Sequence, residues 1–469
     1  MYDARAVTSI SSVMKYDIAI VGGGTSGWLA AAYLSFHNPD KSICLIESPN
    51  IPTIGVGEGT FPTTMWLLRS IGIPPYKLLA EANGGVKLGI EYREFSEKTF
   101  WLSTAGPEEW ETWGTDMAKH VALSGKTAPI EGDNFVACHF VASDLAQLLK
   151  EHSVSLGVTH ISAEVVDTTI TNNHCQNVTL DTGNEITADW FLDCTGFARL
   201  LIKQTESNFT SYAKELLVDS AVVAPTPYKN KAAEFYSYSQ ITARTAGWQF
   251  RIPTWTRVGN GYVYSSQFST PEEAEAELKS TVPVDTVKHL KMTLGYYDDL
   301  IIGNIVATGL SGGFIEPMEA TAIHLTERTI IAFNDLLKGK DTIQSANKYL
   351  RNKIRYIKTL ILAHYAFSKR TEPFWCAAQA AAYNSNEIQE FFSNLQNGKF
   401  PTAQDNLDIA YPYTQWNELL KGFSQPHYYP TINNRSKEQI YMSTYFAPTH
   451  YEHIQYLRNK NDQKNLLSQ

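Results

Sequence analysis

The hydrophobic positions near the start of the chain form one continuous run and then change to a helical spacing. Residues 16–21 (YDIAIV) combine aromatic, β-branched and small side chains, which is typical of a buried parallel strand. A helical segment ending at His37 follows, and residues 42–46 (SICLI) form a second buried run. The pattern predicts a strand–helix–strand unit over residues 15–50.

Further along, short segments alternate between helix and strand patterns. We expect helices at residues 63–71, 143–152 and 323–338, the second of them capped by Ser143. The strand patterns and a predicted hairpin occupy residues 86–95, 163–186 (turning at Asn172–Asn173 and Thr182–Gly183), 190–194 and much of 210–270. From residue 346 onward the pattern is mostly helical.

Three glycines between the first strand and the first helix are spaced for nucleotide binding. Gly22 permits a tight turn, Gly24 lets the backbone approach a pyrophosphate, and Gly27 lets helix and strand pack closely. The helix begins with Thr25 and Ser26, and its N-terminus directs free N–H groups toward phosphates. This arrangement predicts a dinucleotide site.

An acidic residue completes the motif. Glu47 follows the second buried run, twenty residues beyond Gly27, where a carboxylate would bind a ribose hydroxyl. A glycine turn alone is weak support, but here the strand, helix and carboxylate agree. Because the motif opens the chain, it favours FAD over NAD.

The order of elements predicts an α/β fold with a Rossmann-like FAD-binding domain of the flavin monooxygenase type. Glycine turns after buried strands near residues 196 and 309 indicate one discontinuous domain over residues 15–345. Segments within about 60–300 would form an inserted, β-rich, substrate-facing layer. A helical C-terminal region, residues 346–469, would pack on both, and residues 1–14 are expected to be a loose leader.

Composition narrows the class of protein. Of 469 residues, 43% are hydrophobic and 19% charged, which suits a globular protein of two or three domains. The net charge of −9 argues against a nucleic-acid or anionic-membrane surface. No run reaches the ~18 apolar residues of a membrane helix, and residues 1–14 lack the apolar core of a signal peptide. The five scattered cysteines predict reduced thiols and no metal site, so we expect a cytoplasmic protein.

Four further segments have to be explained together. They are VGEGTFP at 56–62, VKLGIEY at 86–92, GWQFRIP at 247–253 and GLSGGFIEPMEATAIHL at 309–325. With these segments the chain resembles the flavin-dependent halogenases, and is similar to the tryptophan halogenases but shorter. The resemblance runs from about Tyr16 to about Leu325 and is thinner beyond.

The resemblance implies a reaction. FADH2 from a separate flavin reductase reacts with O2 to give a C4a-hydroperoxide, which oxidises a bound halide ion to hypohalous acid. The oxidant passes through an internal tunnel to a lysine that positions it or carries it as a haloamine. Electrophilic halogenation of an electron-rich aromatic or heteroaromatic small molecule follows.

Lys87 and Glu319 correspond to the catalytic residues of that family. A desolvated Lys87 ammonium could polarise the oxidant by hydrogen bonding, or lose its proton and become a nucleophile. The alternative interpretation is that Lys87 is an ordinary solvated lysine on the surface. Glu319 could orient the oxidant, stabilise the cationic intermediate or accept its proton, or merely cap a helix. We expect Glu316 to be structural.

The halide site of the family corresponds to the backbone N–H groups of Thr321 and Ala322, at the start of a helix. In the motif F-x-x-P-x-x-S-x-G, this chain has Ala320 and Ala322 in place of serine and glycine. Backbone donors survive this change, although alanine disfavours positive φ. The departure leaves the halide open and favours bromide or iodide, which are larger and easier to oxidise than chloride.

The remaining matches concern the cofactor and the wall beside it. Trp248, Phe250, Ile252 and Pro253 match the W-x-W-x-I-P box, with Phe250 in place of the second tryptophan; a half-buried strand alone is an equal alternative. The residues matched to flavin-binding positions are Gly57 and Glu58 in the first loop, Asp193 and Gly196 in LDCTGF, and Gly309 and Phe314 in the later glycine turn. We expect Asp193 to face polar cofactor atoms.

Two rival functions remain. A flavin-dependent aromatic monooxygenase would use the same cofactor without halide, and a non-catalytic FAD-binding protein would keep only the fold. The presence of both Lys87 and Glu319 in register argues against the second. The substrate, free or carrier-bound, the regiochemistry and the oligomeric state are not determined by the sequence.

Overall fold

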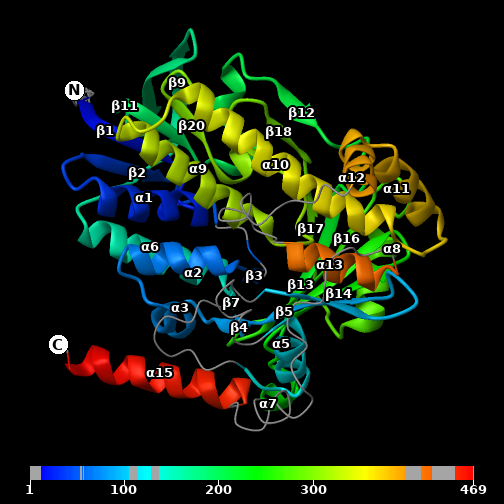
Figure 1. Cartoon of the computed structure of the whole chain (residues 1–469). Coiled ribbons are helices and arrows are strands. Elements are labelled where there is room, and N and C mark those ends of the chain that lie inside the picture. The colour runs from blue at the N-terminus through cyan, green and yellow to red at the C-terminus, as the bar shows by residue number, and fades with distance from the viewer. Residues whose placement is uncertain are drawn as a thin grey trace, which may run out of the picture.

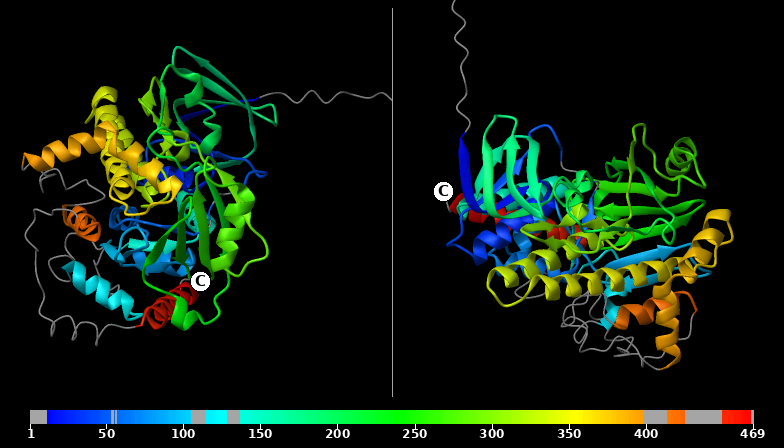
Figure 2. Two further views of the ribbon diagram at one scale, coloured as in Figure 1. Left: turned by 90° about the vertical axis from the view of Figure 1, so that its right-hand side faces the viewer. Right: turned by 90° about the horizontal axis from the view of Figure 1, so that it is seen from above.

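Two large β-sheets and a long helix, α10 (Ile343–Ala366), organise the chain (Figure 1). The computed structural model describes residues 12–52, 55, 57–104, 114–127, 137–397, 413–424 and 449–467. Figure 2 shows α10, in yellow, running along both sheets when the molecule is seen from above. This long helix can therefore deliver side chains to the region between them.

The first sheet carries the nucleotide-binding motif. Its order is β19-β20-β11-β1-β2-β8, and β1 is parallel to both β2 and β11. The predicted hairpin within 163–186 is confirmed, as β9 and β10 extend the sheet beside β11. The strands are β1 (Val13–Val21), β2 (Ile43–Glu47), β8 (Thr159–Ser162), β9 (Val165–Thr171), β10 (His174–Leu180), β11 (Glu185–Asp193), β19 (Ile301–Ile302) and β20 (Ile305–Ala307).

The start of β1 corrects the expected leader. Val13 and Met14 pair with Glu185 and Ile186 of β11, so the sheet begins two residues inside the range 1–14. Pairing with a long neighbouring strand extends β1 beyond its apolar run, which the hydrophobic pattern alone does not reveal. Residues 1–11 lie outside the described part of the chain.

Helices cover the first sheet. α1 (Thr25–His37) packs against α6 (Ala142–Ser155) and α9 (Thr321–Leu337), and α9 packs against α10. The predicted serine cap of α6 is wrong, because the helix begins earlier, after Val141, with no side-chain cap. The Ser143 hydroxyl instead lies 3.2 Å from the Asp144 carboxylate.

The second sheet has the order β17-β13-β16-β15-β14-β5-β6. Its strands come from distant parts of the chain: β5 (Gly89–Arg93), β6 (Phe100–Ser103), β13 (Ser220–Thr226), β14 (Ser239–Arg244), β15 (Gly247–Pro253), β16 (Val258–Tyr264) and β17 (Lys288–Lys291). α8 (Pro271–Thr281) packs on β13 and β16. The range 60–300 is therefore divided between both sheets, and the domain boundaries stay a prediction.

Two three-stranded sheets connect the larger ones. One has the order β3-β7-β4, from β3 (Glu58–Gly59), β7 (Ala137–Phe140) and β4 (Gly85–Lys87); the other has the order β12-β18-β21, from β12 (Phe209–Ser211), β18 (Gly295–Tyr297) and β21 (Gly313–Phe314). The strand character expected over 86–95 is confirmed, in two strands rather than one continuous run. The run breaks at Leu88, whose N–H donates to the Ser237 carbonyl as the chain crosses from β4 to β5.

The remaining helices lie in the segments that connect the strands and in the C-terminal region. They are α2 (Pro62–Ser70), α3 (Pro75–Glu81), α5 (Gly114–Leu123), α7 (Lys231–Glu234), α11 (Pro373–Tyr383), α12 (Asn386–Gln396), α13 (Tyr413–Gly422) and α15 (His450–Leu467), with short 3-10 turns η1 (Gly196–Ala198), η2 (Ile202–Gln204) and η3 (Gly309–Ser311). Of the predicted helical tail, residues 398–412, 425–448 and 468–469 lie outside the described part.

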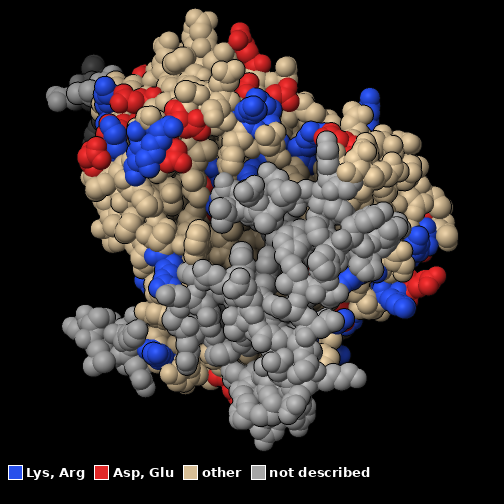
Figure 3. All heavy atoms as spheres, viewed as in Figure 1, with Lys and Arg blue, Asp and Glu red and all other residues tan. Residues whose placement is uncertain are grey.

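The distribution of charge on the surface and the lengths of the helices bear on binding to nucleic acids and membranes. On the face drawn in Figure 3, blue Lys and Arg atoms lie among red Asp and Glu atoms rather than in one basic patch. Among the helices of the described residues, none is both long and apolar enough to cross a membrane. The same described residues contain no group of three His, Cys, Asp or Glu side chains arranged to hold a metal ion.

Candidate functional site

The carboxyl ends of the parallel strands define the first half of the site. β1, β2 and β11 end at Val21, Glu47 and Asp193, with β1 between the other two. The chain leaves β1 through α1 to β2 on one side, while β11 lies on the other. Such a reversal of strand order is where open α/β sheets bind nucleotides.

The glycine turn divides into two residues that the fold requires and one that it leaves open. A Cβ atom at Gly22, whose φ is +114°, would lie 2.3 Å from the Cys194 carbonyl oxygen, and one at Gly27 would lie 1.9 Å from the Gly22 carbonyl oxygen. A Cβ at Gly24 would meet nothing within 4 Å. The turn thus leaves space at Gly24 for a phosphate, which fits the expected pyrophosphate of FAD.

Glu47 lies beside this turn. A Cβ at Gly23 would lie 2.3 Å from the Glu47 side chain, so only a glycine allows the carboxylate to reach that place. Lys150 donates to the Glu47 Oε2 atom at 3.1 Å, and His160 Nε2 lies 2.9 Å from the same atom. The carboxylate is thereby fixed at the end of β2, where a ribose would lie.

Two later segments converge on the same turn. Gly309, with φ of +66°, packs so closely on α1 that a Cβ would lie 2.7 Å from the Ser26 hydroxyl. Phe314 meets Phe197 edge to face at a centroid distance of 6.1 Å. Gly196, with φ of +64°, faces open space like Gly24. The fold therefore brings the predicted flavin segments together.

Asp193 corrects one expectation. Its carboxylate is fully buried and accepts hydrogen bonds from the backbone N–H groups of Thr195, Leu201 and Ile202 at 2.8 to 3.1 Å. The Thr195 hydroxyl donates a further bond of 2.7 Å. Because both oxygens are used inside the fold, Asp193 shapes the loop after β11 rather than facing the cofactor.

Replacing Gly24 with glutamate should separate cofactor binding from folding. Gly24 has φ of −74°, which any residue adopts, and free space around its Cβ, so Gly24→Glu should fold like wild type. Its carboxylate would oppose the pyrophosphate, and we expect FAD affinity to fall by about 100-fold, or about 2.7 kcal/mol. Fluorescence titration with FAD measures this change; Gly24→Ala is the control, and undiminished FAD affinity of Gly24→Glu would contradict the assignment.

The loop at residues 57–59 joins the nucleotide half to the second half of the site. A Cβ at Gly57, where φ is +116°, would lie 3.6 Å from Ile252 and 3.5 Å from Thr254. Burial raises the pKa of Glu58 to about 7. A Cβ at Gly59 would lie 3.1 Å from the Lys87 Nζ atom. The loop therefore touches both β15 and the predicted catalytic lysine.

Lys87 is the last residue of β4 and is only 1% exposed. Its ammonium lies 5.7 Å from the centroid of the Phe61 ring. Within the described residues the ammonium makes no hydrogen bond or ion pair. Burial lowers the Lys87 pKa from 10.5 to about 8, against the opposing charge of Glu319. An unpaired, desolvated amine of this kind can donate to a small oxidant or act as a nucleophile.

Glu319 is fully buried and lies against two side chains that the sequence did not indicate as functional. The Tyr92 hydroxyl donates to its Oε1 atom, and His364 Nε2 lies 3.0 Å from the same oxygen. His364 Nδ1 lies 2.9 Å from the Leu360 carbonyl oxygen one turn earlier in α10. β5 thus supplies a hydrogen-bond donor to the carboxylate, and α10 places the His364 ring beside it.

The neighbouring carboxyl group is part of a separate chain of hydrogen bonds. The Tyr365 hydroxyl donates to Glu316 at 2.9 Å and accepts from the Trp248 indole N–H at 3.1 Å. Burial raises the Glu316 pKa to about 8, so this group is largely protonated at neutral pH. The expected structural role of Glu316 agrees with this geometry.

Adjacent residues of α10, His364 and Tyr365, therefore serve the two glutamates of the E-P-M-E motif. In the sequence both follow an apolar run (LILA) and look like helix core. Tyr92 was within reach of sequence reasoning, because it ends the KLGIEY segment, but nothing in the pattern joined it to a residue 227 positions away. Only the packing of α10 against the sheets brings them together.

The start of α9 has an unusual backbone. Ala320, directly before the helix, has φ of 54° and ψ of 38°, the left-handed conformation that alanine disfavours. Thr321 follows it and is 2% exposed. The first N–H groups of a helix lack partners within that helix, so a partly strained turn presents Thr321 and Ala322 at the predicted halide position.

The W-x-W-x-I-P residues lie on β15. Trp248 and Phe250 are buried on one face of the strand, and half-buried Ile252 on the same face approaches the Gly57 loop. Pro253 ends the strand. The segment thus approaches the Gly57 loop through Ile252 and reaches Glu316 through the hydrogen bond between Trp248 and Tyr365.

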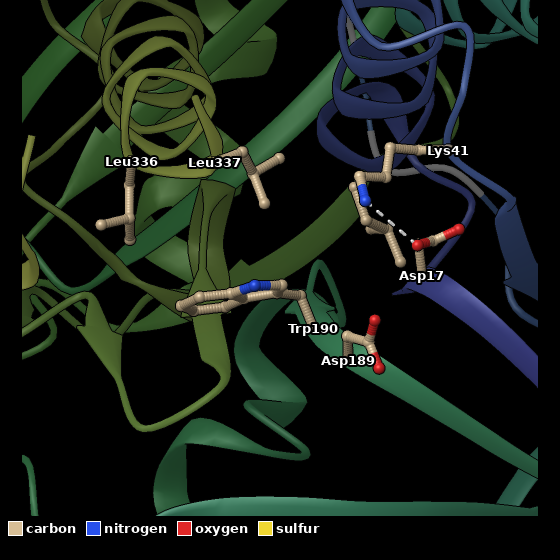
Figure 4. Close-up of a pocket in the computed structure, with 7 residues that line it drawn as sticks. Asp17, Lys41, Asp189, Trp190, Leu336 and Leu337 are labelled. Carbon is tan, nitrogen blue, oxygen red and sulfur yellow. Dashed lines mark hydrogen bonds and ion pairs between the residues drawn. The ribbon is translucent and has the colours of Figure 1, made fainter. Parts of the chain in front are cut away.

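A hollow of about 250 Å³ lies elsewhere, beside the middle of β1 and β11 (Figure 4). Trp190 and the Asp17–Lys41 ion pair, at 3.2 Å, line it together with Leu336 and Leu337 of α9. None of the predicted site residues belongs to this hollow, so we do not assign it to the site.

Comparison with known proteins identifies the relatives of this chain. The sequence model of the family described as "Tryptophan halogenase" matches residues 17–437. The chain is 30% identical to the 7-chloro-L-tryptophan 6-halogenase of Kutzneria sp. (strain 744) over 419 residues, which cover 76% of this chain and 81% of that protein. It is 29% identical to the tryptophan 7-halogenase of Lentzea aerocolonigenes, with 88% of each chain covered.

Solved structures agree. A flavin-dependent halogenase from Xanthomonas campestris superposes with a TM-score of 0.81 at 25% identity, covering 96% of this chain and 98% of that one. A tryptophan 6-halogenase from Streptomyces toxytricini gives a TM-score of 0.83 at 25% identity, covering 94% and 99%. The α/β architecture and the helical C-terminal region are shared across these folds.

Proposed function

Since the chain belongs to the tryptophan halogenase family and is a flavin-dependent halogenase, we propose that Lys87 and Glu319 direct an oxidised halogen onto an electron-rich aromatic substrate. The observation that carries this proposal is the buried Lys87 ammonium, which has no polar partner among the described residues and is coupled electrostatically to Glu319. A buried charge without a hydrogen-bond partner is costly for stability, and the opposing charge of Glu319 offsets only part of that cost, so the buried ammonium indicates a functional role.

FAD fits the nucleotide half of the site. Gly24 and Gly196 leave space for the cofactor, the start of α1 presents N–H groups to its phosphates, and Glu47 would bind its ribose. When bound in reduced form with O2, FAD supplies the oxidising power that converts halide into hypohalous acid. A separate flavin reductase would supply the reduced cofactor.

The N-terminus of α9 would hold the halide ion. Backbone N–H groups of Thr321 and Ala322 supply donors without a charge, and the helix dipole favours an anion there. The Ala322 methyl group and the strained Ala320 backbone alter the shape of this halide site, in line with a preference for bromide or iodide. Halogenation rates with chloride, bromide and iodide at equal concentration measure this preference.

Lys87 would hold hypohalous acid by donating a hydrogen bond to its oxygen. As the ring carbon attacks the halogen, the O–X bond breaks, and the Lys87 proton moves to the leaving hydroxide to form water. The ring then carries an extra proton, which the Glu319 carboxylate accepts, so that aromaticity returns. Proton return from Glu319 to Lys87 restores both groups. A haloamine on Lys87 is the covalent variant of the same step.

The activity is tested with the enzyme, a flavin reductase, NADH, O2, one halide at a time and indole as an activated arene. We expect halogenated indole by mass spectrometry, dependent on halide and on FADH2. Hydroxylated indole that forms irrespective of halide would favour the monooxygenase alternative and overturn the proposal.

The pH dependence distinguishes the two forms of Lys87. With a pKa of about 8, the amine is mainly charged at pH 7, and its charged fraction falls about tenfold by pH 9. If the ammonium is the hydrogen-bond donor, halogenated product per FADH2 oxidised should fall through pH 8 in the same proportion. A rise through pH 8 would contradict the donor role and support the haloamine. Lys87→Arg, which stays charged, is the control, and its residual activity should lack this decline.

A further inference from the structure

The C-terminal helix α15 contacts the strand that carries Lys87. It packs along α3 and β4 (Figure 1). It begins at His450, beyond residue 437, where the match to the family ends. Nothing in the family match therefore assigns a role to this helix.

His450 makes two hydrogen bonds that define its protonation. The Val86 backbone N–H donates to His450 Nε2 at 2.9 Å, and His450 Nδ1 lies 2.9 Å from the Phe235 carbonyl oxygen. Because a carbonyl can only accept, Nδ1 carries the proton and Nε2 is a free acceptor. Burial lowers the His450 pKa to about 3, so this neutral tautomer persists across the working pH range.

The hydrogen bond from Val86 to His450 matters because of the place of Val86 in β4. β4 has three residues and lies at the edge of its sheet, paired on one side only with β7. His450 accepts the outward N–H of Val86, directly before Lys87, where another strand would otherwise pair. Its ring stacks on Phe235 at 4.1 Å, and a Cβ at Gly85 would lie 3.0 Å from it.

Further contacts fix α15 in place. Tyr451 stacks on Trp255 at 5.5 Å, and Lys231 lies 3.1 Å from the centroid of the same Trp255 ring. Arg458 donates to the Ala80 carbonyl oxygen at the end of α3. These contacts tie α15 to Trp255 and to the end of α3, so His450 stays in place if β4 shifts.

We propose that His450 is a positioning residue, which holds β4 so that the Lys87 amine meets the oxidant and substrate. The proposal rests on the role of Lys87 proposed above. Since a displacement of about 1 Å can reduce a rate by about 100-fold, a loose edge strand would release oxidant instead of transferring it. α15 is accordingly part of the active-site framework.

The test compares His450→Phe, which keeps a ring against Phe235 but removes the acceptor, with His450→Gln, which keeps one acceptor and one donor. Tyr456→Ser, on an exposed part of α15, is the control. We measure halogenated indole, FADH2 oxidation, FAD affinity and hypohalous acid captured by monochlorodimedone. For His450→Phe we expect about 100-fold less product per FADH2 oxidised, with more captured oxidant and unchanged FAD affinity. His450→Gln should recover to within about tenfold of wild type.

Several outcomes would overturn the inference. Unchanged product per FADH2 in His450→Phe excludes positioning, and a parallel fall of product, FADH2 oxidation and FAD affinity shows a general structural role. If His450→Phe does not fold, amide hydrogen exchange of the wild-type protein tests the bond between Val86 and His450. A Val86 amide that exchanges without protection would contradict that bond and overturn the inference. A wild-type enzyme that oxidises no halide would instead refute the proposed function itself.

Discussion

Lys87→Met should abolish halogenation while FADH2 oxidation continues, and it should also make the protein more stable. The amine is buried, and its pKa of about 8 lies below the 10.5 of an unfolded chain. Below pH 8 the folded protein therefore holds a charge that burial disfavours. The shift corresponds to about 3 kcal/mol lost at pH 7, and methionine of similar length removes this cost.

The sign of the pH effect follows from proton binding. Between about pH 8 and 10.5 the unfolded chain holds more protons on Lys87 than the folded protein does, so the contribution of Lys87 to stability rises with pH in that window. Lys87→Met should lose this rise and gain stability mainly below pH 8. Thermal unfolding at pH 7 and pH 10 measures both.

Product analysis completes the Lys87 test. Lys15→Met, at a lysine whose side chain is 76% exposed, is the control and should change neither stability nor product. Halogenation by Lys87→Met at the wild-type rate would remove Lys87 from the reaction. A loss of stability in that variant would show that the attraction of the Glu319 carboxylate outweighs the burial cost of the ammonium, contrary to the lowered Lys87 pKa.

Glu319→Gln should reduce halogenated product by about 100-fold or more, because the amide cannot accept the ring proton. The amide retains an oxygen for the Tyr92 hydroxyl, so FADH2 oxidation and FAD affinity should be unchanged. The loss of negative charge should also lower the Lys87 pKa further, since Glu319 is the charge that raises it. The decline of halogenation with pH should then begin below pH 8.

Glu316→Gln is the matched control. Glu316 lies three residues earlier, is equally buried and has a pKa of about 8, so at pH 7 it already resembles its neutral amide. We expect its product yield to stay within about threefold of wild type. Equal losses in the two variants would show that both carboxyl groups act through the structure, and wild-type activity of Glu319→Gln would refute its catalytic role.

The differences between sequence expectation and structure have local causes. The apolar run over 86–95 looks continuous, yet it breaks at Leu88 because the chain changes sheets there. Asp193 follows a buried strand like a ligand-binding acid, yet the N–H groups of the next turn use its oxygens. In each case a contact with a distant or following segment determines the local structure. The periodicity of side chains carries no information about such a contact.

Short-range spacing along the chain was enough to predict the strand–glycine–helix unit, the carboxylate at Glu47, and the family motifs around Lys87 and Glu319. Local backbone geometry dictates these spacings, so they can be read along the chain. Long-range packing sets the depth at which Lys87 is buried and the side chains that surround Glu319, and residue spacing along the chain reveals neither. Tyr92, His364 and His450 lie 5, 277 and 363 positions from Lys87, and the packing of β5, α10 and α15 brings them to the site.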